Sequence, residues 1–140
     1  PSPVCGPARA SLHTGCYPWR TGVFENSDAW PWGRLPGIPE LLGDRGYRTH
    51  AIGKSHFMPN RQGTGGFQTR ESSEEVPDEP ERDDFVRFLQ AAGCPHVWDA
   101  CGQRGDFYYL PQPGQTEERF HNTGWIGDRA VAFLRGQAQS

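Results

Sequence analysis

The segment that most constrains this chain is Cys-Gly-Pro-Ala-Arg at residues 5–9, followed by Thr-Gly at residues 14–15. Residues 1–9 contain prolines and a glycine and predict a loop, whereas the residues from Ala8 to His13 favour a short helix that Thr-Gly ends. We therefore expect Cys5 and Arg9 at the mouth and first turn of that helix. Free N–H groups, the positive end of the helix dipole and a guanidinium would there activate a thiol and attract anions.

The composition predicts one loop-rich domain. Of the 140 residues only 34% are hydrophobic, while 18 are glycine and 13 are proline. The 14 basic and 17 acidic residues give a net charge of −3 without a basic tract, so no nucleic-acid partner is expected. No apolar run approaches the roughly 20 residues of a membrane span.

A helix, a glycine turn and a strand are predicted between residues 36 and 52. Ile38, Leu41 and Leu42 share one helical face within residues 36–45, and residues 47–52 favour a strand. This order is half of a βαβ unit and predicts an α/β fold. Lys54 and His56 follow at the carboxyl end of the strand, where ligand sites gather in open α/β sheets. If the strand persists that far, both side chains share one face.

The second half of the chain contains fewer signals. A long surface loop or partly disordered insertion is expected at residues 60–82, with a solvated acidic stretch at residues 71–84. Helices are predicted at residues 83–92, ended by a glycine, and at residues 123–135. A loop with a short extended piece at residues 108–110 is expected between them.

The blocks at residues 5–15, 17–23, 46–57 and 128–134 occur in the order of a known family. They resemble the signature of the formylglycine-dependent sulfatases, within the alkaline phosphatase-like superfamily. The resemblance implies part of that α/β fold, a mixed sheet flanked by helices, in a fragment of the catalytic domain. Within the fragment, it implies an active-site core segment at residues 1–57, a variable loop-rich insertion at residues 58–120 and a helix returning to the core at residues 121–140.

The resemblance also implies a mechanism. Cys5 would be converted to formylglycine by a formylglycine-generating maturation enzyme, and the aldehyde would hydrate to a diol. One diol oxygen, held by a divalent cation (calcium or magnesium), would attack the sulfur of a sulfated small molecule or sulfated sugar. The second hydroxyl would then expel sulfate. Arg9 would hold the diol, Lys54 would bind the sulfate oxygens, and His56 would hydrogen-bond to the diol, with modified Cys5 as a metal ligand.

The family's other metal ligands are absent from this sequence. The family carries an Asp-Asp pair before the cysteine motif and further ligands well after the region seen here. The adjacent Asp83 and Asp84 are not that pair and are expected at a solvated helix start. We therefore expect a fragment of a larger sulfatase, which by itself would hold metal poorly, would be inactive and would lack sheet neighbours for its strands.

Several alternatives remain open at this point. His121 could face the substrate pocket, or it could be a capping or core histidine. Cys94, His96 and Cys101 fit no standard zinc spacing, and free thiols or a local disulfide are favoured there. A phosphonate or phosphodiester hydrolase of the same superfamily, or a non-catalytic thiol- or metal-binding module with an unmodified Cys5, are the competing functions. The substrate, compartment and oligomeric state are not predicted.

Overall fold

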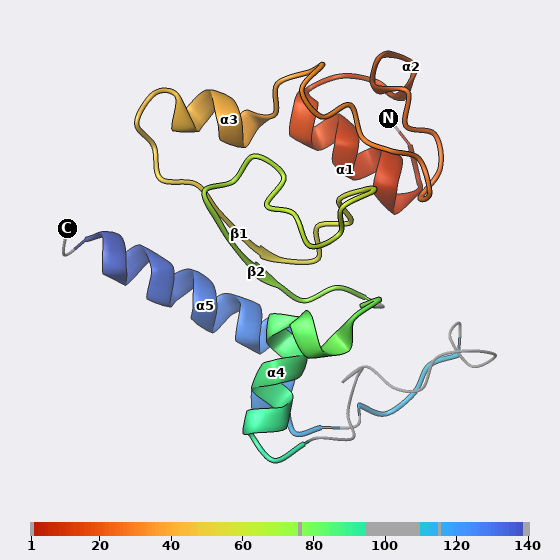
Figure 1. Ribbon diagram of the computed structural model, residues 1–140. Helices are drawn as coiled ribbons and strands as arrows, with labels where there is room; N and C mark the ends of the chain where they lie inside the picture. The colour runs from red at the N-terminus through yellow and green to blue at the C-terminus, as the bar shows by residue number, and fades with distance from the viewer. Residues whose placement is uncertain (1, 76, 95–109, 115, 139–140) are drawn as a thin grey trace. The chain divides into compact units, whose positions relative to one another are not determined.

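The computed structural model describes residues 2–75, 77–94, 110–114 and 116–138. In chain order its elements are α1 (Cys5–Thr14), α2 (Pro18–Thr21), α3 (Ile38–Gly43), β1 (His50–Gly53), β2 (Thr69–Ser72), η1 (Pro80–Arg82), α4 (Asp84–Ala91), η3 (Glu118–Phe120) and α5 (Asn122–Gln137). β1 and β2 pair in parallel (Figure 1), which confirms the α/β class. In the described part of the chain, every helix is too short or too polar to cross a membrane.

The chain divides into two compact units. The first unit comprises Pro1–Ala51 with Ser55–Arg70, and the second comprises Ile52–Lys54 with Glu71–Ser140. Each unit has its own hydrophobic cluster.

α1 is longer than the sequence predicted. Its first turn includes residues 5–9, which were expected to be a loop, and its N-cap is the extended Val4. The prediction was wrong because a proline is compatible with the first turn of a helix, where its missing N–H has no partner to lose. The end was predicted correctly, since Gly15 adopts a left-handed φ of 67° and donates its N–H to Ser11 O.

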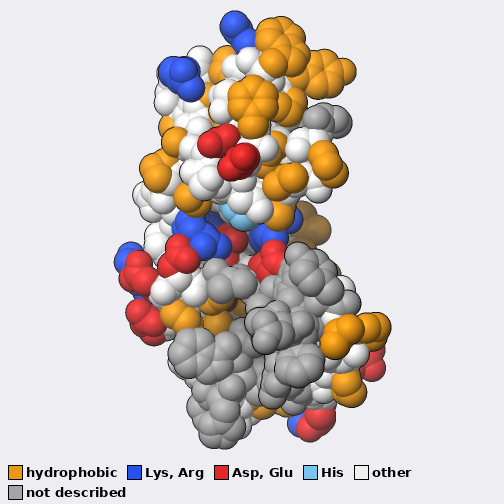
Figure 2. All heavy atoms as spheres, turned by 90° about the vertical axis from the view of Figure 1, so that its right-hand side faces the viewer, with side chains coloured by type: hydrophobic (Ala, Val, Ile, Leu, Met, Phe, Trp, Pro, Cys, Tyr) orange, Lys and Arg blue, Asp and Glu red, His pale blue; other side chains and the backbone are white. Residues whose placement is uncertain are grey.

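The first unit packs around α1. Ala10 is fully buried against Val23, Trp30 and Phe57. Other apolar side chains of this unit are exposed. Figure 2 shows exposed hydrophobic side chains in orange. The most exposed of them are Leu12, Trp19, Tyr17 and Tyr47. α1 thus has one face in the core and an apolar side chain, Leu12, on the surface.

His13, near the end of α1, lies in an aromatic cluster. The centroid of its ring is 5.6–5.9 Å from those of four aromatic rings, namely Trp30, Trp32, Phe57 and Phe67. Burial lowers the pKa of His13 below 6.5, although the charge of Glu40 and a backbone hydrogen bond at Gly65 act in the opposite direction. The neutral imidazole is therefore the form that this core accommodates.

This burial predicts a loss of stability in acid. The unfolded chain binds a proton at His13 near pH 6.5, whereas the folded chain binds it only at lower pH. The contribution to the free energy of unfolding is therefore complete above pH 6.5 and is lost as the pH falls through the lowered pKa. The free energy of unfolding can be measured by urea denaturation at about pH 7.5 and about pH 5.5. We expect the difference between the two values to be smaller in His13→Leu than in the wild type. His50→Gln, at a histidine of β1 outside the aromatic cluster, serves as the control. An unchanged difference in His13→Leu would contradict the assignment.

The second unit packs α4 against α5. Phe85, Leu89 and Trp125 form its buried cluster, and Phe88 packs against them. Both helices predicted in this half of the chain are confirmed, at Asp84–Ala91 and Asn122–Gln137. The periodic apolar residues of α4 were sufficient to predict it because three of them lie on its buried face.

Asp83 is buried rather than solvated, which corrects the sequence prediction. Its side chain is the N-cap of α4, accepting hydrogen bonds from the N–H of Val86 at 3.1 Å and of Glu74 at 2.9 Å. Only 2% of the residue is exposed, and burial raises its pKa although these hydrogen bonds favour the charged form. The two backbone donors explain why a carboxylate is retained at a buried position.

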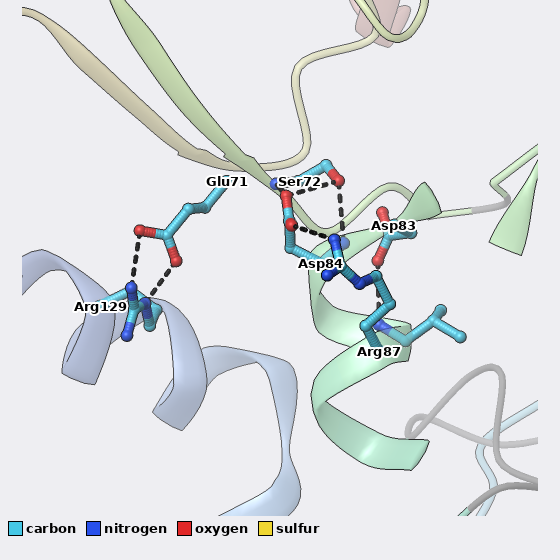
Figure 3. A network of polar contacts seen from close by, with 7 residues as sticks. Glu71, Ser72, Asp83, Asp84, Arg87 and Arg129 are labelled. Carbon is cyan, nitrogen blue, oxygen red and sulfur yellow. Dashed lines mark hydrogen bonds and ion pairs between the residues drawn. The ribbon is translucent and has the colours of Figure 1, made fainter. Parts of the chain in front are cut away.

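The acidic stretch at residues 71–84 is also structured rather than simply solvated. Its first part lies in β2, and η1 follows, so the loop predicted at residues 60–82 is wrong in this part. The Asp84 carboxylate accepts from Ser72 N at 2.8 Å and from Ser72 Oγ at 3.2 Å (Figure 3). Glu71 pairs with Arg129 of α5 through both carboxylate oxygens. These contacts join β2 to the two long helices of the second unit.

Candidate active site

α1 presents Cys5 and Arg9 together. Cys5 is the first residue of α1, and Arg9 follows one turn later. Side chains four residues apart lie on the same face of a helix, so the thiol and the guanidinium are neighbours. Cys5 is a free thiol, and both residues are half-buried. The arrangement combines a chemically reactive group with a permanent positive charge at the positive end of a helix.

Asn26 reaches the start of α1 from a loop that is distant in sequence. Its Oδ1 accepts the N–H of Gly6 at 2.7 Å, and its Nδ2 donates to Cys5 Sγ at 3.6 Å. A Cβ placed on Gly6 would lie 3.0 Å from the same Oδ1, which shows how closely the two residues approach. The carboxamide thus satisfies one unpaired N–H of the helix end and contacts the thiol at the same time.

His56 joins this group through the backbone of the same asparagine. Its Nε2 lies 3.3 Å from the carbonyl oxygen of Asn26, and it donates that hydrogen bond when the proton is on Nε2. The backbone of His56 is left-handed, with a φ of 59°, which is uncommon for a residue other than glycine. Within the first unit, Cys5 and His56 therefore both contact Asn26, Cys5 through its side chain and His56 through its carbonyl oxygen.

The strand does not extend to Lys54 and His56, so the condition for a shared strand face is not met. β1 ends at Gly53, whose φ of 94° belongs to the region that side chains rarely adopt. Lys54 belongs to the second unit, where its ammonium forms an ion pair with Glu75. The two side chains are 21% and 31% exposed. The candidate sulfate-binding lysine is therefore paired with a carboxylate.

His121 lies at the N-cap of α5 in the second unit. Its Nδ1 accepts the N–H of Thr123 at 3.3 Å. This is the capping position that the sequence left open as the alternative to a place in the substrate pocket. The contact gives the imidazole a structural part in starting α5, and a substrate contact by His121 stays a prediction.

The remaining cysteine predictions are answered in part. Cys16 and Cys94 are free and half-buried. Cys101, His96 and the extended piece predicted at residues 108–110 lie outside the described residues or at their edge. Among the residues that the structure describes, no three His, Cys, Asp or Glu side chains gather into a group that could hold a metal ion.

Asn26 is the site residue that the sequence analysis missed. Its contacts join residues 20, 21 and 30 positions apart, so neither helical nor strand periodicity reports them. The sequence Glu-Asn-Ser-Asp at residues 25–28 favours a turn, which is the only local signal available. That signal predicts a turn but does not predict that Asn26 contacts the start of α1.

The sequence of this chain is similar to those of known sulfatases. The family model named Sulfatase matches residues 1–133. The chain is 37% identical over 138 residues to the choline-sulfatase of Rhizobium meliloti (strain 1021), covering 99% of the chain and 22% of that protein. It is 30% identical over 138 residues to the uncharacterized sulfatase YdeN of Escherichia coli (strain K12), covering 90% of the chain and 23% of that protein. The chain thus spans less than a quarter of the length of these two curated relatives.

A solved structure shares the fold. The phosphonate monoester hydrolase of Agrobacterium radiobacter matches with a TM-score of 0.61 and 19% identity, over 92% of this chain and 28% of that one. The similarity confirms the expected α/β fold of the alkaline phosphatase-like type. The family match over residues 1–133 is the stronger finding, because it includes both the Cys-Gly-Pro-Ala-Arg segment and the loop after β1. The chain belongs to the sulfatase family.

Proposed function

We propose that this chain supplies the nucleophile side of a sulfatase active site that hydrolyses sulfate esters. The observation that carries the proposal is the position of Cys5 at the start of α1, with Arg9 one turn later and Asn26 in contact with the thiol. Membership of the sulfatase family supports it. The proposed substrate class is a sulfated small molecule or a sulfated sugar.

The proposed nucleophile is formylglycine, made from Cys5 by a formylglycine-generating maturation enzyme. When hydrated, this group supplies an oxygen nucleophile and a second hydroxyl that permits release of sulfate. The surroundings of Cys5 suit such a group, because the Nδ2 of Asn26 can donate to an oxygen as it does to Sγ. Arg9 stabilises negative charge beside position 5, His56 transfers a proton, and Lys54 binds sulfate oxygens.

A divalent cation, calcium or magnesium, is part of the proposal, but the described residues do not form a site for it. Modified Cys5 is the ligand that we assign to this chain. We assign no further ligand among the described residues, and we derive no step through the metal.

The test is a comparison of substrates with the complete natural protein that carries this chain, co-expressed with the maturation enzyme. We expect an aryl sulfate or a sulfated sugar to be hydrolysed with release of sulfate, at a higher kcat/KM than aryl phosphonate and phosphodiester analogues. A higher kcat/KM for the phosphorus esters would support the alternative hydrolase instead. An unmodified Cys5 without turnover of any ester would support the non-catalytic thiol- or metal-binding module.

The pairing of Lys54 with Glu75 predicts a change in KM. Removing the carboxylate in Glu75→Gln leaves the ammonium with less of its charge offset, so a sulfate ester is attracted more strongly. We expect KM to fall by about two- to fivefold, in line with the modest energy of partly exposed ion pairs, while kcat changes little.

The matched control is Glu79→Gln, which breaks the exposed pair between Glu79 and Arg82. This variant should leave KM unchanged. A rise of KM in Glu75→Gln would contradict the prediction, because it would mean that Glu75 orients Lys54 rather than offsetting its charge.

A further inference from the structure

The loop that carries Asn26 is closed by its own carboxylate. Asp28 Oδ2 accepts the N–H of Phe24 at 2.7 Å and the N–H of Glu25 at 2.9 Å, while the N–H of Asp28 donates to Glu25 O at 3.3 Å. The two backbone hydrogen bonds lower the pKa of Asp28, so the acceptor is ionised at neutral pH. Such side-chain to backbone contacts are how aspartate stabilises tight turns.

Core packing fixes the two ends of this loop but not its tip. Val23 is fully buried and Trp30 is 5% exposed, so both flanks are anchored in the first unit. The four residues 24–27 are all exposed. The conformation of the tip therefore depends on polar contacts, of which those of Asp28 lie within the loop and those of Asn26 reach out of it.

Asn26 contacts the candidate site through both its side chain and its backbone carbonyl oxygen. Its side chain contacts Gly6 and Cys5 at the start of α1, and its carbonyl oxygen contacts His56. A change in the loop would alter both contacts together. The loop tip thus contacts both the start of α1 and His56, which follows β1.

We propose that Asp28 is a positioning residue, which closes the loop at residues 24–28 and so holds Asn26 against Cys5 and His56. The catalytic consequence rests on the function proposed above, whereas the effect on the loop does not. The carboxylate of Asp28 bonds to Phe24 and Glu25 within the loop, and so it acts on the site through Asn26.

Hydrogen exchange of one amide tests the effect on the loop. The N–H of Gly6 donates to Asn26 Oδ1, whereas that of Ala8 donates to Val4 O at 3.0 Å within α1. In Asp28→Ala of the complete natural protein, we expect Gly6 to exchange about tenfold faster or more, with Ala8 unchanged. In Asp28→Asn the side-chain oxygen still accepts both N–H groups, so Gly6 should stay within about threefold of the wild-type rate. Unchanged protection of Gly6 in Asp28→Ala, or equal loss at Gly6 and Ala8, would overturn the proposal.

Kinetics of the matured protein test the catalytic consequence. We expect Asp28→Ala to lower kcat by about tenfold or more with a smaller change in KM, because a displaced nucleophile slows the chemical step. Asp28→Asn should restore kcat. If Gly6 exchanges faster in Asp28→Ala but kcat is unchanged, the claim that Asp28 positions the reacting groups would be overturned. If the wild-type protein hydrolyses no sulfate ester, the proposed function fails, and the exchange rates of Gly6 still decide whether Asp28 holds the loop.

Discussion

Replacement of Cys5 by alanine is expected to lower kcat for sulfate esters by about 10⁴-fold or more in the complete protein, since it removes the proposed nucleophile. The fold should survive, because Cys5 is the half-buried first residue of α1 and alanine favours a helix. Initial rates of sulfate release measure the effect. Near-UV circular dichroism of the same samples checks that the fold is intact.

Cys16→Ala is the matched control for this variant. Cys16 is also free and half-buried, and it lies just after α1. Its replacement should leave kcat within about twofold of wild type, as for a substitution outside the site. Retention of activity by Cys5→Ala, or an equal loss in Cys16→Ala, would contradict the assignment of Cys5 as the nucleophile position.

The second large effect is expected for His56→Asn. Asparagine tolerates the left-handed φ of 59° better than alanine does, so the variant removes the imidazole with little backbone strain. If His56 transfers a proton, kcat should fall by about 10²- to 10⁴-fold. The dependence of kcat on pH should also lose the limb to which this imidazole contributes.

His50→Asn provides the comparison for that experiment. His50 lies in β1, where its Nδ1 contacts Thr69 Oγ1 at 2.7 Å. We expect the His50 variant to keep the wild-type pH profile. A His56→Asn enzyme with wild-type kcat and an unchanged profile would exclude His56 from the chemistry.

Features set by nearby residues could be predicted from the sequence. The helix at Asp84–Ala91 followed from the spacing of Phe85, Phe88 and Leu89, because the face that these residues form is buried. The helix beside Cys5 and its end at Gly15 followed from residues 8–15, although α1 begins earlier than predicted, at Cys5. In both cases the information lies within one or two helical turns.

Features set by distant contacts could not be predicted. β2 reads Thr-Arg-Glu-Ser and lacks the apolar alternation of a strand. The burial of Asp83 depends on the N–H of Glu74, and β1 ends at Gly53, before it reaches Lys54 and His56. The contact of Asn26 with Cys5 bridges 21 residues. Each of these features depends on contacts between residues that are distant in the sequence, so it can be identified only from the folded structure.

The mass of the peptide containing Cys5 tests the central claim most directly. The peptide should be prepared from the complete natural protein after co-expression with a formylglycine-generating enzyme, and the Cys16 peptide serves as the internal reference. The account predicts that the Cys5 peptide has lost H2S and gained one oxygen atom, while Cys16 keeps its thiol. An intact thiol at Cys5 under these conditions would contradict the proposed sulfatase mechanism.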